Sequence, residues 1–128
     1  MTSELTSLTA VTVFTAVLWM PYILNMIAVR GIKDAVGYPE EPRPLSPWAQ
    51  NMKAAHANAV ENLVVFATLV LVAHLADVHT AATELACQVY FWARVVHAFS
   101  YTFAVPWVRT LAFLTGFGCQ AVLAVALL

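Results

Sequence analysis

The chain has 128 residues, of which 62% are hydrophobic and only 10% are charged, and its formal net charge is −1 at pH 7. So apolar a composition cannot cover a water-soluble core with enough polar surface; it excludes an ordinary soluble domain and predicts an integral membrane protein. The nearly neutral charge, with no basic stripe or acidic tail, also excludes a typical nucleic-acid or polyionic partner.

Four stretches are long and apolar enough to cross a bilayer, since a spanning helix needs about 20 mainly apolar residues. They cover residues 5–29, 54–76, 82–105 and 107–128. Little chain remains outside them, so we predict a single all-α membrane domain over residues 1–128, a bundle of four transmembrane helices. The first stretch has no basic leader and no small-residue cleavage site, so we expect it to be a helix of the mature protein rather than a signal peptide.

Several special residues within these stretches are interpreted as packing features. Pro21 removes a backbone donor and predicts a kink near Val17. Asn25 lies four residues later on the same face, and we interpret it as a hydrogen-bonding contact to a neighbouring segment, with ligand contact as the alternative. Gly116 and Gly118 in the last stretch are expected to let another helix approach closely.

The segment between the first two stretches, residues 31–47, holds four of the six prolines together with charged residues. This composition cannot enter lipid or continue a helix, so it predicts an ordered or semi-rigid crossover. Ser46 followed by Pro47 is typical of a helix start, with the serine as N-cap and the proline in the first turn.

The distribution of basic residues predicts the orientation in the membrane. Lysines and arginines concentrate at the ends of the stretches that meet residues 31–53 and the turn near Pro106, whereas residues 77–84 contain none. Because cytoplasmic loops of membrane proteins are enriched in lysine and arginine, we expect the 31–53 segment and the Pro106 turn to be cytoplasmic and both termini to lie outside.

The second and third stretches each carry polar side chains at helical spacing on one face. These are Asn58, Glu61 and Asn62 in the second stretch, and Arg94, His97 and Tyr101 in the third. If the helices are antiparallel, Glu61 and Arg94 lie at comparable depth, and we predict that they form an ion pair. Such a pair is either a structural link between two helices or part of a functional site, because ionisable groups inside a membrane usually mark one.

The same polar array continues toward the Pro106 turn with Arg109 and Thr110. Both lie in the first turn of the predicted last helix, where free backbone N–H groups and the helix dipole favour anions. Together the array offers more hydrogen-bond donors than one carboxylate can use, which indicates an anionic ligand. The alternative is that Arg109 reaches toward lipid phosphates.

Metal or thiol chemistry is not indicated elsewhere in the chain. Cys87 and Cys119 are single cysteines in apolar stretches, and we expect packed free thiols. His74 and His79 lie five residues apart and off a common helical face, so we expect interfacial residues and no metal site.

Three short segments in combination resemble one known family of membrane proteins. They are Ala-His-Ala-Asn-Ala-Val-Glu-Asn-Leu at 55–63, Ala-Arg-Val-Val-His-Ala-Phe-Ser-Tyr at 93–101 and Pro-Trp-Val-Arg-Thr at 106–110. The pattern is similar to the MAPEG family, the membrane-associated proteins in eicosanoid and glutathione metabolism, with closest likeness to bacterial-type members. The resemblance extends over nearly the whole chain, and it implies a homotrimer of four-helix protomers that binds glutathione between neighbouring protomers.

The resemblance further implies a glutathione S-transferase-type enzyme, a transferase or peroxidase that uses glutathione as co-substrate to conjugate or reduce lipophilic electrophiles or lipid hydroperoxides arriving from membrane lipids. The implied glutathione contacts are Asn58, Glu61, Arg94, His97, Tyr101 and Arg109, and the implied catalytic residues are Arg109, Tyr101 and Thr110. One position departs from the pattern, because glutathione-using relatives generally carry arginine where this chain has Ala54. The alternative is a noncatalytic trimeric membrane protein that binds lipid or a small anionic ligand, or an accessory subunit.

Overall fold

The computed structural model describes residues 1–128 and is entirely α-helical, as the sequence predicts. Its elements are α1 (Ser3–Val17), α2 (Trp19–Arg30), α3 (Ile32–Val36), α4 (Pro47–Leu75), α5 (Ala81–Thr102) and α6 (Pro106–Leu127). Three helical stretches are long and apolar enough to cross a membrane: α1 together with α2, then α4, then α6. Helix α5 is as long as α6, at 22 residues, but it is not among these three candidate spans.

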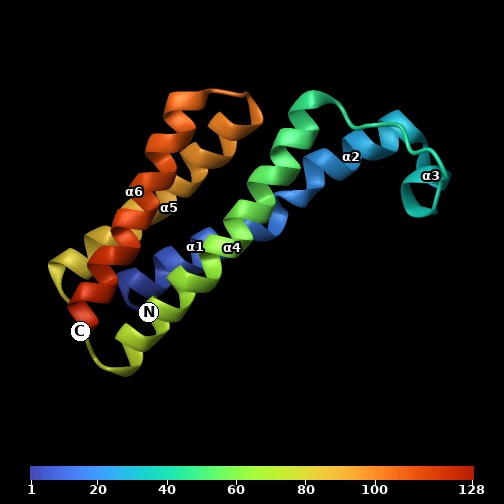
Figure 1. Ribbon diagram of the computed structural model, residues 1–128. Coiled ribbons are helices and arrows are strands. Elements are labelled where there is room, and N and C mark those ends of the chain that lie inside the picture. The colour runs from blue at the N-terminus through green and yellow to red at the C-terminus, as the bar shows by residue number, and fades with distance from the viewer.

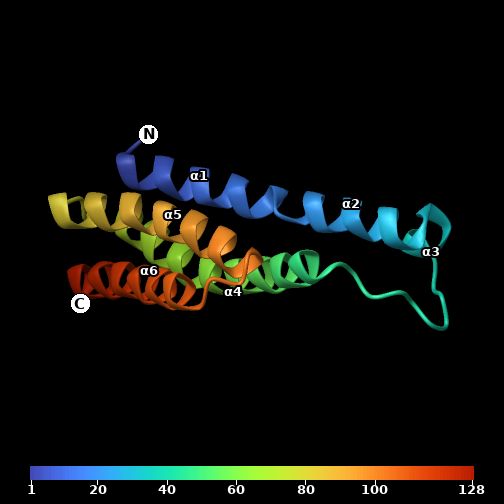
Figure 2. The ribbon, with the colours of Figure 1, turned by 90° about the horizontal axis from the view of Figure 1, so that it is seen from above.

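The long helices run alternately up and down (Figure 1). Both termini and the α4–α5 connection lie at one end of the bundle, whereas the α5–α6 turn and the crossover with α3 lie at the other. Helix α5 packs against α1, α4 and α6. Figure 2 shows α1 and α6 on opposite sides of it, so α5 is the central helix of this chain.

The predicted kink in the first stretch is confirmed as a break at Leu18. Helix α1 ends at Val17 and α2 begins at Trp19. Pro21 has no N–H to donate to the Val17 carbonyl, and the Leu18 N–H bonds the Thr15 carbonyl at 3.3 Å in a tighter turn. The two helices therefore continue one another with a change in backbone geometry between them (Figure 1).

The crossover is held at both ends by hydrogen bonds. Asn25 of α2 donates to the Ser46 hydroxyl at 2.9 Å and accepts from the Ser46 N–H at 3.0 Å, which confirms its predicted structural role. Helix α4 begins at Pro47 as expected, but the Ser46 side chain accepts this bond from Asn25 instead of capping its own helix. Helix α3 was not predicted: it occupies the part of the crossover that precedes the first proline, Pro39.

The main core lies toward the end of the bundle that carries the termini, and α1, α4, α5 and α6 all contribute to it. Its buried residues are Val11, Phe66, Val70, Ala86, Cys87, Tyr90, Cys119 and Leu123. The rings of Phe66 and Tyr90 stack with centroids 3.8 Å apart. Both cysteines are buried free thiols, as predicted.

Gly116 of α6 faces this core, whereas Gly118 does not. A Cβ on Gly116 would lie 3.6 Å from the Tyr90 ring and 3.8 Å from Arg94 Cδ, which is ordinary van der Waals distance. A Cβ on Gly118 would meet nothing within 4 Å, so the predicted close helix approach at Gly118 has no partner within this chain.

Replacing Asn25 by leucine should release the crossover, because two hydrogen bonds to Ser46 are lost together. We expect the free energy of unfolding to fall by about 1–3 kcal/mol and proteolysis within residues 37–45 to accelerate. Circular dichroism in detergent and limited proteolysis measure the two effects. Thr68→Val is the control, because the Thr68 hydroxyl bonds only its own helix; equal protease resistance in both variants would contradict the assignment.

The space above Gly116 should accept a methyl group and nothing larger. Gly116→Ala is expected to raise the free energy of unfolding by up to about 1 kcal/mol, since alanine favours the helix. The melting temperature should rise accordingly. Gly116→Leu should instead cost about 1–3 kcal/mol, because the longer side chain must displace Tyr90 or Arg94. The same pair of changes at Gly118 should show no such contrast.

Candidate functional site

A small polar pocket opens where α4, α5 and α6 meet, near the α5–α6 turn. It has a volume of about 190 Å³ and is lined by Asn58, His97, Tyr101, Arg109, Thr110 and Phe113. Five of these six residues belong to the set selected from the sequence. Helical spacing brings them together: His97 and Tyr101 are one turn apart on α5, and Arg109 and Phe113 are one turn apart on α6.

Arg94 lies deeper in the bundle than the pocket, and it is only 2% exposed. Its Nη2 donates to Asn58 Oδ1 at 2.7 Å, so the arginine reaches the pocket through a residue that lines it. Its Nε is buried without a hydrogen-bond partner. No carboxylate of this chain forms a salt bridge with Arg94, and the guanidinium therefore lies in the bundle with only a neutral partner.

The predicted ion pair between Glu61 and Arg94 is therefore wrong. Asn58 occupies the place beside Arg94 that the sequence analysis assigned to Glu61. Glu61 is exposed on the surface of α4 and does not line the pocket. Asn58 and Glu61 are three residues apart and therefore lie on the same broad face of α4. The rotation of α4 about its axis turns only Asn58 inward.

Aromatic rings hold the charged and titratable groups of the pocket. The guanidinium carbon of Arg109 lies 4.7 Å from the centroid of the Tyr101 ring, a cation–π arrangement. The His97 ring is 5.6 Å from the Tyr101 ring and 6.3 Å from the Phe113 ring. His97 is 2% exposed, and its Nδ1 has no partner within the chain.

Thr110 is the most exposed of the predicted catalytic residues. Its hydroxyl donates to the Pro106 carbonyl at 3.2 Å, within its own helix. The Arg109 N–H likewise bonds the Val105 carbonyl at 3.1 Å, so it does not point at a ligand. At this end of α6 the group suited to contact an anion is thus the Arg109 side chain rather than the backbone N–H or the Thr110 hydroxyl.

Several contacts around this pocket were not predicted from the sequence. Phe113 forms its apolar wall, and the only signal was its position one turn after Arg109. Gln120 of α6 donates to the Asn62 carbonyl at 3.2 Å and joins α6 to α4 behind the pocket. His56, part of the motif at 55–63, instead contacts the Tyr22 hydroxyl at 2.7 Å, outside the pocket.

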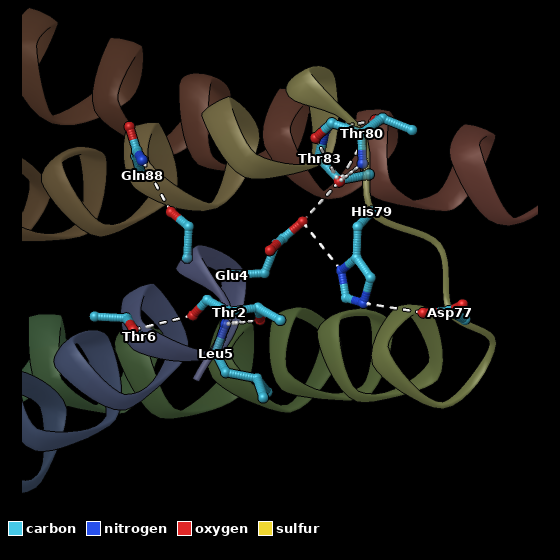
Figure 3. A network of polar contacts seen from close by, with 10 residues as sticks. Thr2, Glu4, Leu5, Thr6, Asp77, His79, Thr80, Thr83 and Gln88 are labelled. Atoms are coloured by element: carbon cyan, nitrogen blue, oxygen red, sulfur yellow. Dashed lines mark hydrogen bonds and ion pairs between the residues drawn. The ribbon is translucent and has the colours of Figure 1, made fainter.

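A second polar cluster lies at the opposite end of the bundle, beside the N-terminus (Figure 3). Glu4 is only 6% exposed, accepts a hydrogen bond from the Thr83 hydroxyl at 3.0 Å and faces His79 Nδ1 at 3.5 Å. The other ring nitrogen of His79 lies 3.7 Å from Asp77. The His74 ring is 5.9 Å from that of His79, yet no group of side chains here is arranged to hold a metal ion.

Several apolar hollows lie outside the polar pocket, among them a groove and a smaller pocket. A groove of about 380 Å³ runs between α5 and α6, lined by Val89, Trp92, Ala93, Val96, Val108, Leu111, Ala112 and Thr115. A pocket of about 200 Å³ lies at the α1–α2 break, between Phe14 and Leu18 on one side and α4 and α5 on the other. Both surfaces suit lipophilic molecules rather than ions.

The arrangement as a whole suits an anion. The residues that line the pocket supply donors and a guanidinium, a second guanidinium lies directly behind Asn58, and no carboxylate lines the cavity. Hydrogen bonds in which the donor or the acceptor is ionised are stronger than those between neutral groups.

Of three comparisons with known proteins, one found a match. Searches among curated proteins and among solved structures found no match. A family model described as MAPEG family matches residues 9–128, which is nearly the whole chain and includes every residue of the pocket. The chain therefore belongs to the MAPEG family, membrane proteins of glutathione and eicosanoid metabolism.

Proposed function

We propose that this protein is a membrane glutathione transferase or peroxidase that acts on lipophilic electrophiles or lipid hydroperoxides. Family membership and the donor-rich pocket together support the proposal. Glutathione carries two carboxylates, an ammonium group and a thiol at neutral pH. It is therefore an anion with a reactive sulfur, and the pocket offers groups suited to both.

The observation that carries the proposal is the buried Arg94 without a carboxylate partner. An uncompensated charge inside a membrane protein costs several kcal/mol, on the order of 3 kcal/mol or more. A carboxylate of the bound tripeptide, reaching the guanidinium beside Asn58, removes that cost. His97 and Asn58 supply further donors at the same wall of the pocket.

Arg109 is proposed to stabilise the glutathione thiolate. Arg109 lines the pocket, and its guanidinium carbon lies 4.7 Å from the centroid of the Tyr101 ring. A nearby positive charge favours the thiolate, which is the attacking form of the thiol. The Tyr101 and Thr110 hydroxyls are the supporting donors. Thr110 can donate to the ligand once its hydroxyl gives up its hydrogen bond to the Pro106 carbonyl.

The two proposed reactions share this thiolate. In conjugation, sulfur forms a bond to an electrophilic carbon while the electron pair of the broken bond leaves with the departing group or the opened ring. In peroxide reduction, two glutathione molecules become one disulfide while the hydroperoxide becomes an alcohol and water. The lipophilic partner is expected to reach the site from the bilayer along apolar surfaces of α1 and α6, and the groove between α5 and α6 adds one such surface.

We also propose a homotrimer in which glutathione lies between neighbouring protomers. Glu61 supports this assembly: it is exposed in the middle of a helix suited to span a membrane, where a carboxylate facing lipid is strongly disfavoured. A second copy covering α4 shields Glu61 and places it near the ammonium group of the ligand. The exposed stripe around it contains the small residues Ala54 and Ala57, which permit close helix contact.

The proposed topology has four spans: the three long apolar helical stretches and, in addition, α5. Helix α5 runs alongside α1, α4 and α6 and bears its polar residues toward them, which supports a place inside the bundle despite its lower hydropathy. The basic residues near the crossover and near Pro106 lie at the same end (Figure 1). By the positive-inside rule that end is proposed to be cytoplasmic, with both termini outside.

A noncatalytic trimeric protein that binds lipid or a small anionic ligand, or serves as an accessory subunit, is the second candidate. The observation that favours it is Ala54, one turn before Asn58 on α4, where the exposed surface has no guanidinium. Ala54→Arg should tighten glutathione binding if the site is a transferase site. In a noncatalytic protein that substitution should create neither affinity nor turnover.

Glutathione at millimolar concentration should raise the melting temperature of the purified protein, because a ligand that binds only the folded state stabilises it. S-alkyl glutathione should do the same. Arg109→Ala should remain folded, lose most of the turnover with electrophiles and reduce the shift with glutathione. Arg43→Ala, which removes an exposed arginine of the crossover, is the matched control; equal loss in both variants, or no shift in the wild type, would contradict the proposal.

A bulky residue on the exposed stripe of α4 should disrupt the trimer. Ala57→Trp adds a large ring beside Glu61 and should lower the oligomer mass in detergent, since overpacking an interface costs about 1–3 kcal/mol per site. Leu114→Trp makes a comparable change on an exposed part of α6 and should leave the mass unchanged. Light scattering or native mass spectrometry distinguishes a trimer from the 14.0 kDa monomer.

A further inference from the structure

A continuous series of amide contacts lies behind the polar pocket. Gln120 Nε2 of α6 donates to the Asn62 carbonyl at 3.2 Å. Asn62 Nδ2 donates to the Asn58 carbonyl at 2.9 Å and to Asn58 Oδ1 at 3.2 Å. Arg94 Nη2 of α5 donates to the same Oδ1 at 2.7 Å. Neither Asn62 nor Gln120 lines the pocket, so the series reaches it only through Asn58.

The chemistry of the partners determines how each carboxamide is turned. A guanidinium has only donors, so the Asn58 atom that faces Arg94 must be its oxygen. The Asn62 atom that faces the Asn58 oxygen and backbone carbonyl must then be its NH₂ group. Gln120 faces a backbone carbonyl and must also present its NH₂ group. No alternative assignment of oxygen and nitrogen satisfies these contacts.

We propose that Asn62 is a positioning residue for the anion pocket. With its oxygen held from two sides, by Arg94 and by Asn62, the Asn58 carboxamide presents its NH₂ group to the pocket. Every polar side chain that lines the pocket can then donate a hydrogen bond to a ligand. The proposal rests on the proposed function in that the ligand it serves is glutathione, although the orientation of Asn58 exists without ligand.

The burial of the series explains why its orientation matters. Gln120 is 7% exposed and Arg94 is 2% exposed, whereas Asn58 and Asn62 between them are half-buried, so water has little access to the two ends of the series. Without Asn62 the Asn58 oxygen keeps Arg94 as its single donor, so fewer hydrogen bonds oppose an orientation in which this oxygen turns toward an anionic ligand. That orientation replaces an attraction with a repulsion at the wall of the pocket.

The first test measures glutathione binding by calorimetry in detergent. Asn62→Leu keeps the size of the side chain but removes the donor, and we expect the dissociation constant to rise about fivefold, the value of one net hydrogen bond. Asn51→Leu is the matched control, because Asn51 lies on the same helix and donates at 3.4 Å to the Thr102 carbonyl, away from the pocket. In an Asn58→Ala background, Asn62→Leu should have no further effect; a fivefold loss that persists there would overturn the proposal.

The second test needs no ligand. The chain has only four asparagines, so selective ¹⁵N-asparagine labelling gives four side-chain NH₂ signals, and Asn58→Ala identifies one of them. We expect that signal to be sharp in the wild type and shifted or broadened by Asn62→Leu, but unchanged by Asn51→Leu. If Asn62→Leu changes neither the position nor the width of the Asn58 signal, the proposal is overturned. Asn62→Ala replaces the leucine variant if the latter does not fold.

The two tests separate the failure of this proposal from that of the proposed function. If the wild type does not bind glutathione but the Asn58 signal responds to Asn62→Leu, the glutathione proposal fails and the positioning role of Asn62 is supported. If glutathione binds and neither its affinity nor the Asn58 signal responds to Asn62→Leu, the positioning role fails alone.

Discussion

The guanidinium of Arg94, buried between helices without a carboxylate, is the constraint on which the rest of the structure depends. Its stem passes Gly116 of α6 beside Tyr90, and its Cδ lies 3.8 Å from the point that a Cβ on that glycine would occupy. Its head reaches Asn58 on α4. One residue of the central helix thus lies against both neighbouring helices, and the same charge supports the proposed preference of the adjacent pocket for anions.

Most of the fold could be predicted from the sequence, because its determinants are local. The length of the apolar stretches predicts the long helices. Pro21 predicts the break at Leu18, and Ser46 with Pro47 predicts the start of α4. Helix α5 ends at Thr102, before the predicted end, because the chain reverses there and Ala104 adopts a φ of 57°. The short helix α3 escaped prediction, since five residues give too weak a periodic signal.

The candidate site could be predicted as a set of residues but not as a set of contacts. Helical periodicity assigns Asn58 and Glu61 to one face, but the rotation of α4 against α5 decides which of them meets Arg94, and that depends on packing over the whole helix. Asn62 shares the face and was left without a role. The contact between Glu4 and Thr83 joins residues that are far apart in the sequence, so no local sequence pattern predicts it.

That last contact bears on the order in which the protein is assembled. A chain enters the membrane from its N-terminus, so α1 is in place long before residues 79–83 have been synthesised. Until then, the Glu4 carboxylate has neither Thr83 nor His79 beside it and must remain hydrated at the membrane surface. The N-terminal end of α1 can therefore become fixed only when α5 has been made, so the first helix to be made is among the last to be fixed at both ends.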